Sequence, residues 1–244
     1  MELHFECTDL SIWKEAISSY KSRIESLDKP NLVSLDEFYR NELPPLLHQR
    51  NPNPFITTSE LSRLMQWKLT RGKWRPRLLD FVSSLDDSLV KSASQKAFQS
   101  LPDISKAVSE LTVLKGVGPA TASAVLAAYA PETAPFMSDE AMEAALGDSK
   151  DYSLKQYLLF VDKIQSKSKL ILIEHLCMDT LKNGIKFKRG LLHAIRCGEG
   201  SVEFSCRDKV AIFTSCSGQQ DEGKQQKKEK TLIESKISLQ LLAS

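Results

Sequence analysis

Residues 114–122, which read LKGVGPATA, are of types that can hold an anion. Helical apolar spacing on both sides predicts two helices joined by a tight turn, a hairpin over residues 104–129. The first turn of a helix leaves backbone N–H groups without partners, and the helix dipole strengthens their attraction for an anion. Gly116 can take the left-handed backbone conformation that closes the first helix. Neither Gly116 nor Gly118 has a side chain to block a phosphate, and Lys115 adds a positive charge. This stretch is therefore interpreted as a phosphate site; the alternative is an ordinary packing joint between two helices.

Residues 63–77 form a second stretch suited to anions, because every charged side chain in it is basic. Two tryptophans, Trp67 and Trp74, lie between these charges. Lysine and arginine neutralise phosphates, and an exposed aromatic ring stacks on an unpaired base, so the segment is suited to nucleic acid. The alternative is a solvated basic helix end with two tryptophans in the core. The cations are Arg63, Lys68, Arg71, Lys73, Arg75 and Arg77.

Helices must position these residues, because apolar side chains recur at helical spacing along most of the chain. Thr57 with Glu60 forms a capping box that starts one helix. The Pro44-Pro45 pair is expected to end another, which starts with a capping box at Ser34. The fold class is therefore all-α. Further helices are expected over residues 8–27, 76–85, 87–99, 139–147, 153–165 and 168–182.

The helical spacing fades from Gly184 onward. Residues 184–214 are predicted to be irregular or weakly β-stranded, because a few apolar residues alternate there. Residues 215–244 are rich in Gln, Lys and Glu, a composition that predicts a disordered polar tail. We therefore expect a helical domain over residues 1–183.

The composition is that of an ordinary globular chain of 244 residues, with 41% hydrophobic and 26% charged residues. Lys and Arg number 33 against 31 Asp and Glu, so any nucleic-acid affinity must come from local clustering. No apolar run approaches membrane-spanning length, and the N-terminal residues do not resemble a secretory signal. The five widely spaced cysteines are typical of free thiols in a reducing compartment, without a zinc site.

The hairpin, the helices before it and an aspartate after it resemble the helix-hairpin-helix DNA glycosylase superfamily, which includes endonuclease III-like and alkylation-repair enzymes. Residues 103–145 carry the specific part, and the helices over residues 57–183 fit in number and spacing. The segments WKL at 67–69, GKWRP at 72–76 and FMSDE at 136–140 are similar to a poorly characterised eukaryotic branch. The resemblance implies a bundle of two helical halves in a monomer that binds duplex DNA, in the nucleus or otherwise the cytosol. The implied DNA-binding residues are Lys115, Gly116, Val117, Gly118, Ala120, Thr121, Lys68, Arg71, Lys73 and Arg75.

The resemblance also implies a reaction at Asp139, which matches the family's aspartate after the hairpin. Breaking an N-glycosidic bond develops positive charge on the sugar, and a fixed carboxylate stabilises that charge and orients the attacking water. The damaged base must first leave the stack and enter a pocket with aromatic walls. An ordinary N-cap is the other role for Asp139, and the two roles are compatible. The base-pocket candidates are Trp67, Trp74, Tyr129 and Tyr157.

The chain departs from the family pattern at two places. Members that also cut the strand carry a lysine two residues after the second hairpin glycine, where this chain has Ala120, and alanine cannot form a Schiff base. The four closely spaced cysteines that hold the iron-sulfur cluster of the endonuclease III type are also missing near the C-terminus, so we expect no cofactor. Three functions remain open: a glycosylase that uses water, a DNA-binding or scaffold protein without activity, and a protein-interaction domain.

Overall fold

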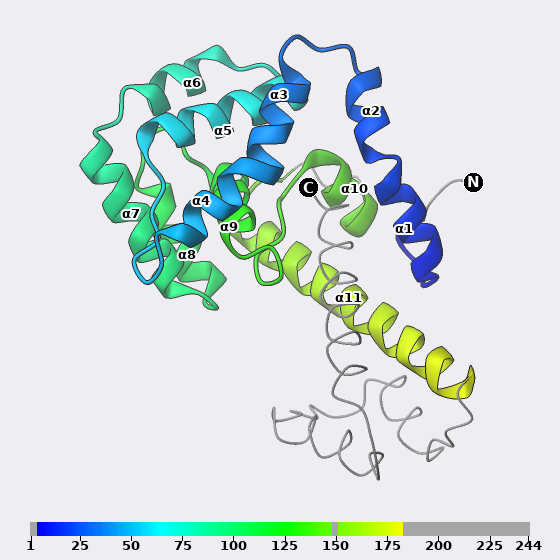
Figure 1. Cartoon of the computed structure of the whole chain (residues 1–244). Coiled ribbons are helices and arrows are strands. Elements are labelled where there is room, and N and C mark those ends of the chain that lie inside the picture. The colour runs from blue at the N-terminus through cyan, green and yellow to red at the C-terminus, as the bar shows by residue number, and fades with distance from the viewer. Residues whose placement is uncertain (1–3, 148–150, 183–244) are drawn as a thin grey trace. The chain divides into compact units, whose positions relative to one another are not determined.

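The structure is a computed structural model that describes residues 4–147 and 151–182, with side chains up to Ile171. Regular structure in these residues is helical, without strands, as the sequence predicts (Figure 1). The predicted irregular segment, residues 184–214, and the predicted tail, residues 215–244, lie outside the described residues. The helices are α1 (Leu10–Ser18), α2 (Tyr20–Ser26), α3 (Leu32–Glu37), the π-helical η1 (Phe38–Glu42), α4 (Leu43–Gln49), α5 (Thr58–Arg71), α6 (Pro76–Ser83), α7 (Asp87–Ser100), α8 (Ile104–Thr112), α9 (Pro119–Tyr129), α10 (Asp139–Leu146) and α11 (Leu154–Lys182).

The chain divides at Leu172 into two compact units. The first contains all the helices up to α10 and the beginning of α11. Of the second, the structure describes only the helical backbone of residues 172–182. The fold and the candidate site below therefore concern the first unit.

Several helices begin at the residues that their sequences predict. Thr57 and Glu60 form a complete capping box at the start of α5. The side chain of Asp103 accepts a hydrogen bond from Lys106 N at 3.0 Å and caps α8. Pro76 occupies the first turn of α6, where its missing N–H costs nothing.

Four predicted boundaries are wrong. The helix expected over residues 8–27 is broken at Ser19 into α1 and α2. Pro44 and Pro45 do not end a helix; they lie in the first turn of α4, where proline needs no N–H partner, after the π-helical turn η1. The predicted helices over residues 153–165 and 168–182 are one continuous helix, α11, because neither Gly nor Pro interrupts the sequence between them. The capping box at Ser34 is also wrong, since α3 begins two residues earlier, at Leu32.

Helix α9, the second helix of the hairpin, lies at the centre of the unit. It contacts α4, α5, α7 and α8. Most of its side chains are small, and residues 121–126 are all buried, so it is covered on nearly every side. The hydroxyl of Tyr39 donates to the carbonyl of Ala124 at 3.1 Å, and the amide of Met137 donates to Ser123 Oγ at 3.0 Å. The hairpin is therefore anchored in the main hydrophobic core.

Candidate nucleic-acid interface

The hairpin turn has the backbone geometry that the sequence predicts at its first glycine. Gly116 has a φ of 89°, a left-handed conformation that side chains rarely tolerate. Gly118 has a φ of −97° and is the N-cap of α9. Leu114 and Val117 are buried and fix the turn to the core, whereas Gly118 is exposed. The turn thus presents its second glycine to solvent on a rigid base.

Four backbone N–H groups of the turn have no hydrogen-bond acceptor in the described part of the chain. The Val117 N–H donates to the Leu114 carbonyl at 3.0 Å, and the N–H groups of residues 121 and 122 both donate to the Gly118 carbonyl. Within residues 4–147 and 151–182, the N–H groups of Lys115, Gly116, Gly118 and Ala120 have no acceptor. Unpaired N–H groups at a helix N-terminus attract anions. This arrangement is suited to an oxyanion such as a phosphate.

Helix α6 supports the turn from one side. A Cβ atom on Gly116 would lie 3.0 Å from Phe81 Cβ and 3.5 Å from the Leu78 carbonyl oxygen, so α6 leaves no room for a side chain there. The Lys115 ammonium lies 4.5 Å from the centre of the Phe81 ring, a cation–π contact. A Cβ atom on Gly118 would meet nothing within 4 Å. The first glycine therefore serves packing, and the second leaves the amides accessible.

The basic segment continues directly into α6, so it is connected to the hairpin through this helix. A helix of eight residues is about 12 Å long, which sets the scale of that connection. Lys73 and Arg75 are exposed and make no ion pair with the described residues. Arg63 and Arg71 are instead engaged with the fold, Arg63 with Glu42 at 3.3 Å. The cations that remain available for a ligand lie after the end of α5.

Asp139 lies at the first position of α10, and its side chain is exposed. The N-cap role considered for it belongs to Ser138, whose hydroxyl accepts a hydrogen bond from Ala141 N at 3.2 Å. Asp139 Oδ1 accepts a hydrogen bond of 2.9 Å from the hydroxyl of Tyr152. Nothing in the sequence indicated Tyr152, because it lies in a short loop outside any motif. The Asp139 side chain is therefore oriented by Tyr152, and it is not the N-cap of α10.

The structure brings Asp139 and the basic segment together. Burial lowers the pKa of Lys68, and the nearby Asp139 carboxylate opposes that shift. Burial also raises the pKa of Tyr152, and its hydrogen bond to Asp139 raises it further, whereas Arg75 lowers it. Asp139 is therefore close enough to interact electrostatically with Lys68 and Tyr152, and Arg75 is close enough to interact with the same two side chains.

A second link joins the same two elements one turn further along α5. Arg71 Nη1 lies 3.6 Å from Glu140 Oε2, and the Arg71 side chain is only 15% exposed. The Lys29 ammonium donates a 2.6 Å hydrogen bond to the Arg71 carbonyl. The C-terminal end of α5 is therefore held against the first turn of α10.

The four aromatic base-pocket candidates do not come together. Trp67 is fully buried, stacks on Tyr39 with ring centres 3.7 Å apart, and donates from Nε1 to Asp36 Oδ1 at 2.9 Å. Tyr157 is also fully buried, and its hydroxyl donates to the Pro135 carbonyl. The side chain of Tyr129 stacks between other aromatic rings and bonds to Asn51 at 3.1 Å. Trp74, by contrast, is 55% exposed.

Comparison of the chain with protein-family models, curated proteins and solved structures finds no match. The resemblance to the glycosylase superfamily, the two helical halves, the monomeric state and the nuclear location therefore stay predictions. Among the residues that the structure describes, no helix is long and apolar enough to cross a membrane. No cluster of His, Cys, Asp and Glu in that part of the chain is arranged to hold a metal.

Proposed function

We propose that this protein binds duplex DNA by holding the phosphate backbone, with the hairpin turn on one phosphate and the basic segment on others. The observation that carries this proposal is the connection through α6: the hairpin turn, with its unpaired N–H groups, packs on this helix at Gly116, and the exposed cations Lys73 and Arg75 directly precede the helix. Backbone amides and mobile cations recognise phosphate without reading bases. The binding is therefore independent of sequence and weakens with salt.

Base removal at Asp139 is the reaction that this binding would serve. In hydrolysis of an N-glycosidic bond, the bond from C1′ to the base breaks, water supplies a hydroxyl to C1′, and the base leaves with a proton. Asp139 would stabilise the positive charge on the sugar and orient the water, with its carboxylate held by Tyr152. Ala120 excludes a Schiff base at the family's lysine position, which favours water as the nucleophile.

Binding without catalysis is the second candidate function, and two observations favour it. Asp139 is exposed, and neither Trp67 nor Tyr157 offers a ring face to a base, because both are fully buried. A protein that kept the hairpin and lost the reaction would have these features. In that case Asp139 only contributes to the folding of the loop through Tyr152.

Titration of a labelled duplex tests the binding. Lys115→Ala should lower the affinity and reduce the slope of log affinity against log salt by about 1, because one phosphate contact is lost. Lys106→Ala is the matched control, since Lys106 is an exposed lysine at the other end of α8. Equal affinities for wild type and Lys115→Ala at all salt concentrations would count against the hairpin as a phosphate site.

A screen of alkylated, deaminated and oxidised duplexes separates the two candidates. The enzyme candidate requires release of a base by wild type and a loss of at least about a hundredfold in Asp139→Asn. Duplex binding without release from any lesion supports the non-catalytic candidate. Release at the wild-type rate by Asp139→Asn would remove Asp139 from the mechanism.

A further inference from the structure

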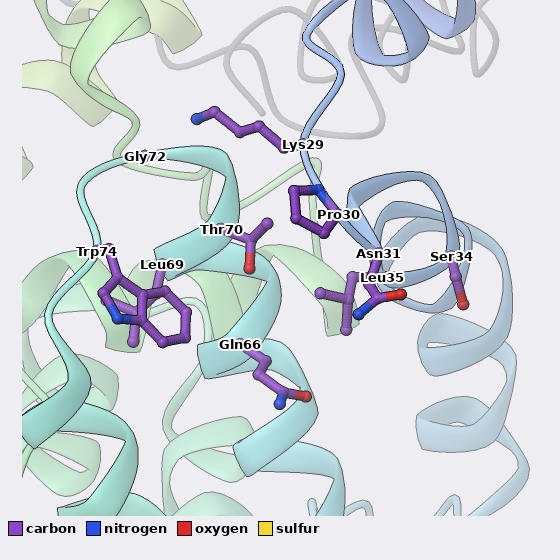
Figure 2. Close-up of a pocket in the computed structure, with 10 residues that line it drawn as sticks. All are labelled: Lys29, Pro30, Asn31, Ser34, Leu35, Gln66, Leu69, Thr70, Gly72 and Trp74. Carbon is purple, nitrogen blue, oxygen red and sulfur yellow. The ribbon is translucent and has the colours of Figure 1, made fainter.

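A pocket of about 670 Å³ lies between the N-terminal turn of α3 and the C-terminal end of α5 (Figure 2). Its wall includes Gly72 and Trp74 from the basic segment on one side and Pro30 and Asn31 on the other, with α5 between them. Asp139 does not line it. The pocket is therefore distinct from the candidate catalytic position, although both lie at the end of α5.

One wall of the pocket is the indole of Trp74, which is 55% exposed. Single exposed apolar side chains are common on protein surfaces, but this ring also forms part of a pocket wall, where a flat partner can stack on it. Its sequence neighbours, Lys73 and Arg75, are exposed cations without ion-pair partners in the described part of the chain. A flat ring between two free cations is suited to a ligand that combines an aromatic ring with phosphates.

The rest of the pocket supplies hydrogen-bonding groups that are also free. Asn31 and Gln66 carry amides, each with donors and an acceptor, and Ser34 and Thr70 carry hydroxyls. None of these four side chains has a hydrogen-bond partner among the described residues. Amide side chains pair with the edges of nucleobases through one donor and one acceptor. The lining thus matches a flat heterocycle with polar edges better than a purely apolar group.

The pocket is connected to α10 through Lys29 and Arg71. Lys29, which lines the pocket, donates to the Arg71 carbonyl at 2.6 Å, and Arg71 pairs with Glu140, next to Asp139. The pocket and the first turn of α10 are therefore both linked to the C-terminal end of α5 through Arg71.

We propose that this pocket takes an unpaired nucleobase of DNA, stacked on the indole of Trp74, with Asn31 and Gln66 bonding to its edge and Lys73 and Arg75 on the adjoining phosphates. The inference rests on the proposed DNA binding and names its substrate class: duplexes that contain an unpaired base. Because Asp139 does not line the pocket, the base held here is not the base that would be removed.

The experiment compares a fully paired duplex with the same duplex carrying a one-nucleotide bulge. The chain has three tryptophans, and Trp13 and Trp67 are 5% and 0% exposed, so quenching of tryptophan emission by a stacked base reports on Trp74. Wild type should bind the bulged duplex about tenfold more tightly, as expected for one base stacked on an aromatic ring, with quenching. Trp74→Ala should lose the preference and keep the affinity for paired DNA, and Trp74→Phe should retain part of the preference.

Two further variants make the outcomes distinguishable. Leu89→Ala removes another exposed apolar side chain, on α7, and should change neither affinity. Gly118→Val should weaken binding of both duplexes equally, because it acts at the hairpin. A bulge preference that survives in Trp74→Ala, or wild type that binds paired DNA with no preference, would overturn the pocket proposal alone. Absence of binding to either duplex would overturn the proposed function as well.

Discussion

Gly116 and Gly118 have different roles in the turn, although they lie only two residues apart. Gly116 combines a left-handed backbone with a close contact to Phe81, so the turn depends on it for folding. Gly118 has ordinary backbone angles and open space around it, so only access to the amides requires the missing side chain. A variant at Gly118 therefore isolates binding, whereas one at Gly116 mixes binding with stability.

Alanine at the two glycines should separate these roles in stability measurements. Gly116→Ala is expected to lower the free energy of unfolding by about 1–3 kcal/mol, because a side chain is strained at positive φ. Gly118→Ala is expected to cost less than about 1 kcal/mol, the loss of a glycine N-cap. Urea denaturation followed by circular dichroism measures both. Equal losses in the two variants would show that the turn is not packed on α6 as described.

At the candidate site, the sequence predicts the conformation of single residues better than the side chains that they contact. The left-handed Gly116 could be predicted, because the glycine pattern of the hairpin requires it. The role of Trp67 could not be predicted from the sequence. Its apolar spacing on α5 indicates burial, whereas its place in the basic segment indicates exposure. In the structure Trp67 is buried against Tyr39. Tyr152 could not be predicted either, because its contact with Asp139 depends on the path of a loop.

Helix starts were predictable where a local side chain satisfies the first N–H groups, as at Thr57 and Asp103. Helix ends and the connections between helices were less predictable, because they depend on tertiary packing. The Pro44-Pro45 pair would end a helix in isolation, but here a π-helical turn precedes it and α4 continues the chain. The contact that joins α2 to α3 could not be predicted either. The hydroxyl of Tyr20 donates a 2.8 Å hydrogen bond to the buried side chain of Asp36.

Alkaline unfolding tests this join between α2 and α3. Burial, reinforced by the Asp36 carboxylate, raises the pKa of Tyr20 from 10.0 to about 12. Between these pH values the unfolded chain loses the proton and the folded chain keeps it, so the contribution of Tyr20 to stability is present below pH 10 and is lost as the pH rises to about 12. At neutral pH the free energy of unfolding of Tyr20→Phe should be about 1 kcal/mol lower than that of wild type. Above pH 10 the difference should shrink, because only wild type loses the contribution of Tyr20.

Urea denaturation at a series of pH values compares the two proteins. Burial also raises the pKa of Tyr39 and of Tyr157, so both proteins should weaken at high pH and only the difference between them reports on Tyr20. Parallel stability curves for wild type and Tyr20→Phe would contradict the buried hydrogen bond to Asp36.

At the scale of the whole molecule, charge is nearly balanced, with 33 basic and 31 acidic residues, so the proposed affinity for DNA must come from one surface. The all-α class followed from periodicity, since most of the chain repeats apolar residues at helical spacing. Periodicity does not predict that Asp139 approaches Lys68 or that Tyr152 approaches Arg75, because both depend on how α10 lies against the end of α5. The sequence of either segment alone does not indicate contacts between residues so far apart in the chain.

Salt titration tests whether the hairpin and the basic segment act on separate phosphates of one duplex. Lys73→Ala with Arg75→Ala should reduce the slope of log affinity against log salt by about 2, and adding Lys115→Ala should reduce it by about 3 in all. The Lys106→Ala control should leave the slope unchanged. If the triple variant falls no further than the double variant, the two surfaces do not bind DNA together.

The affinity of Gly118→Val for a fully paired duplex is the most direct measurement of whether the hairpin turn holds DNA. Valine fits the backbone angles and the open space at this position, so the variant should fold with a stability within about 1 kcal/mol of wild type. Its side chain would stand beside the free N–H groups of Gly118 and Ala120 and keep a phosphate away. We predict that the affinity falls about tenfold at low salt. An affinity equal to that of wild type in a folded Gly118→Val protein would contradict DNA binding through this hairpin.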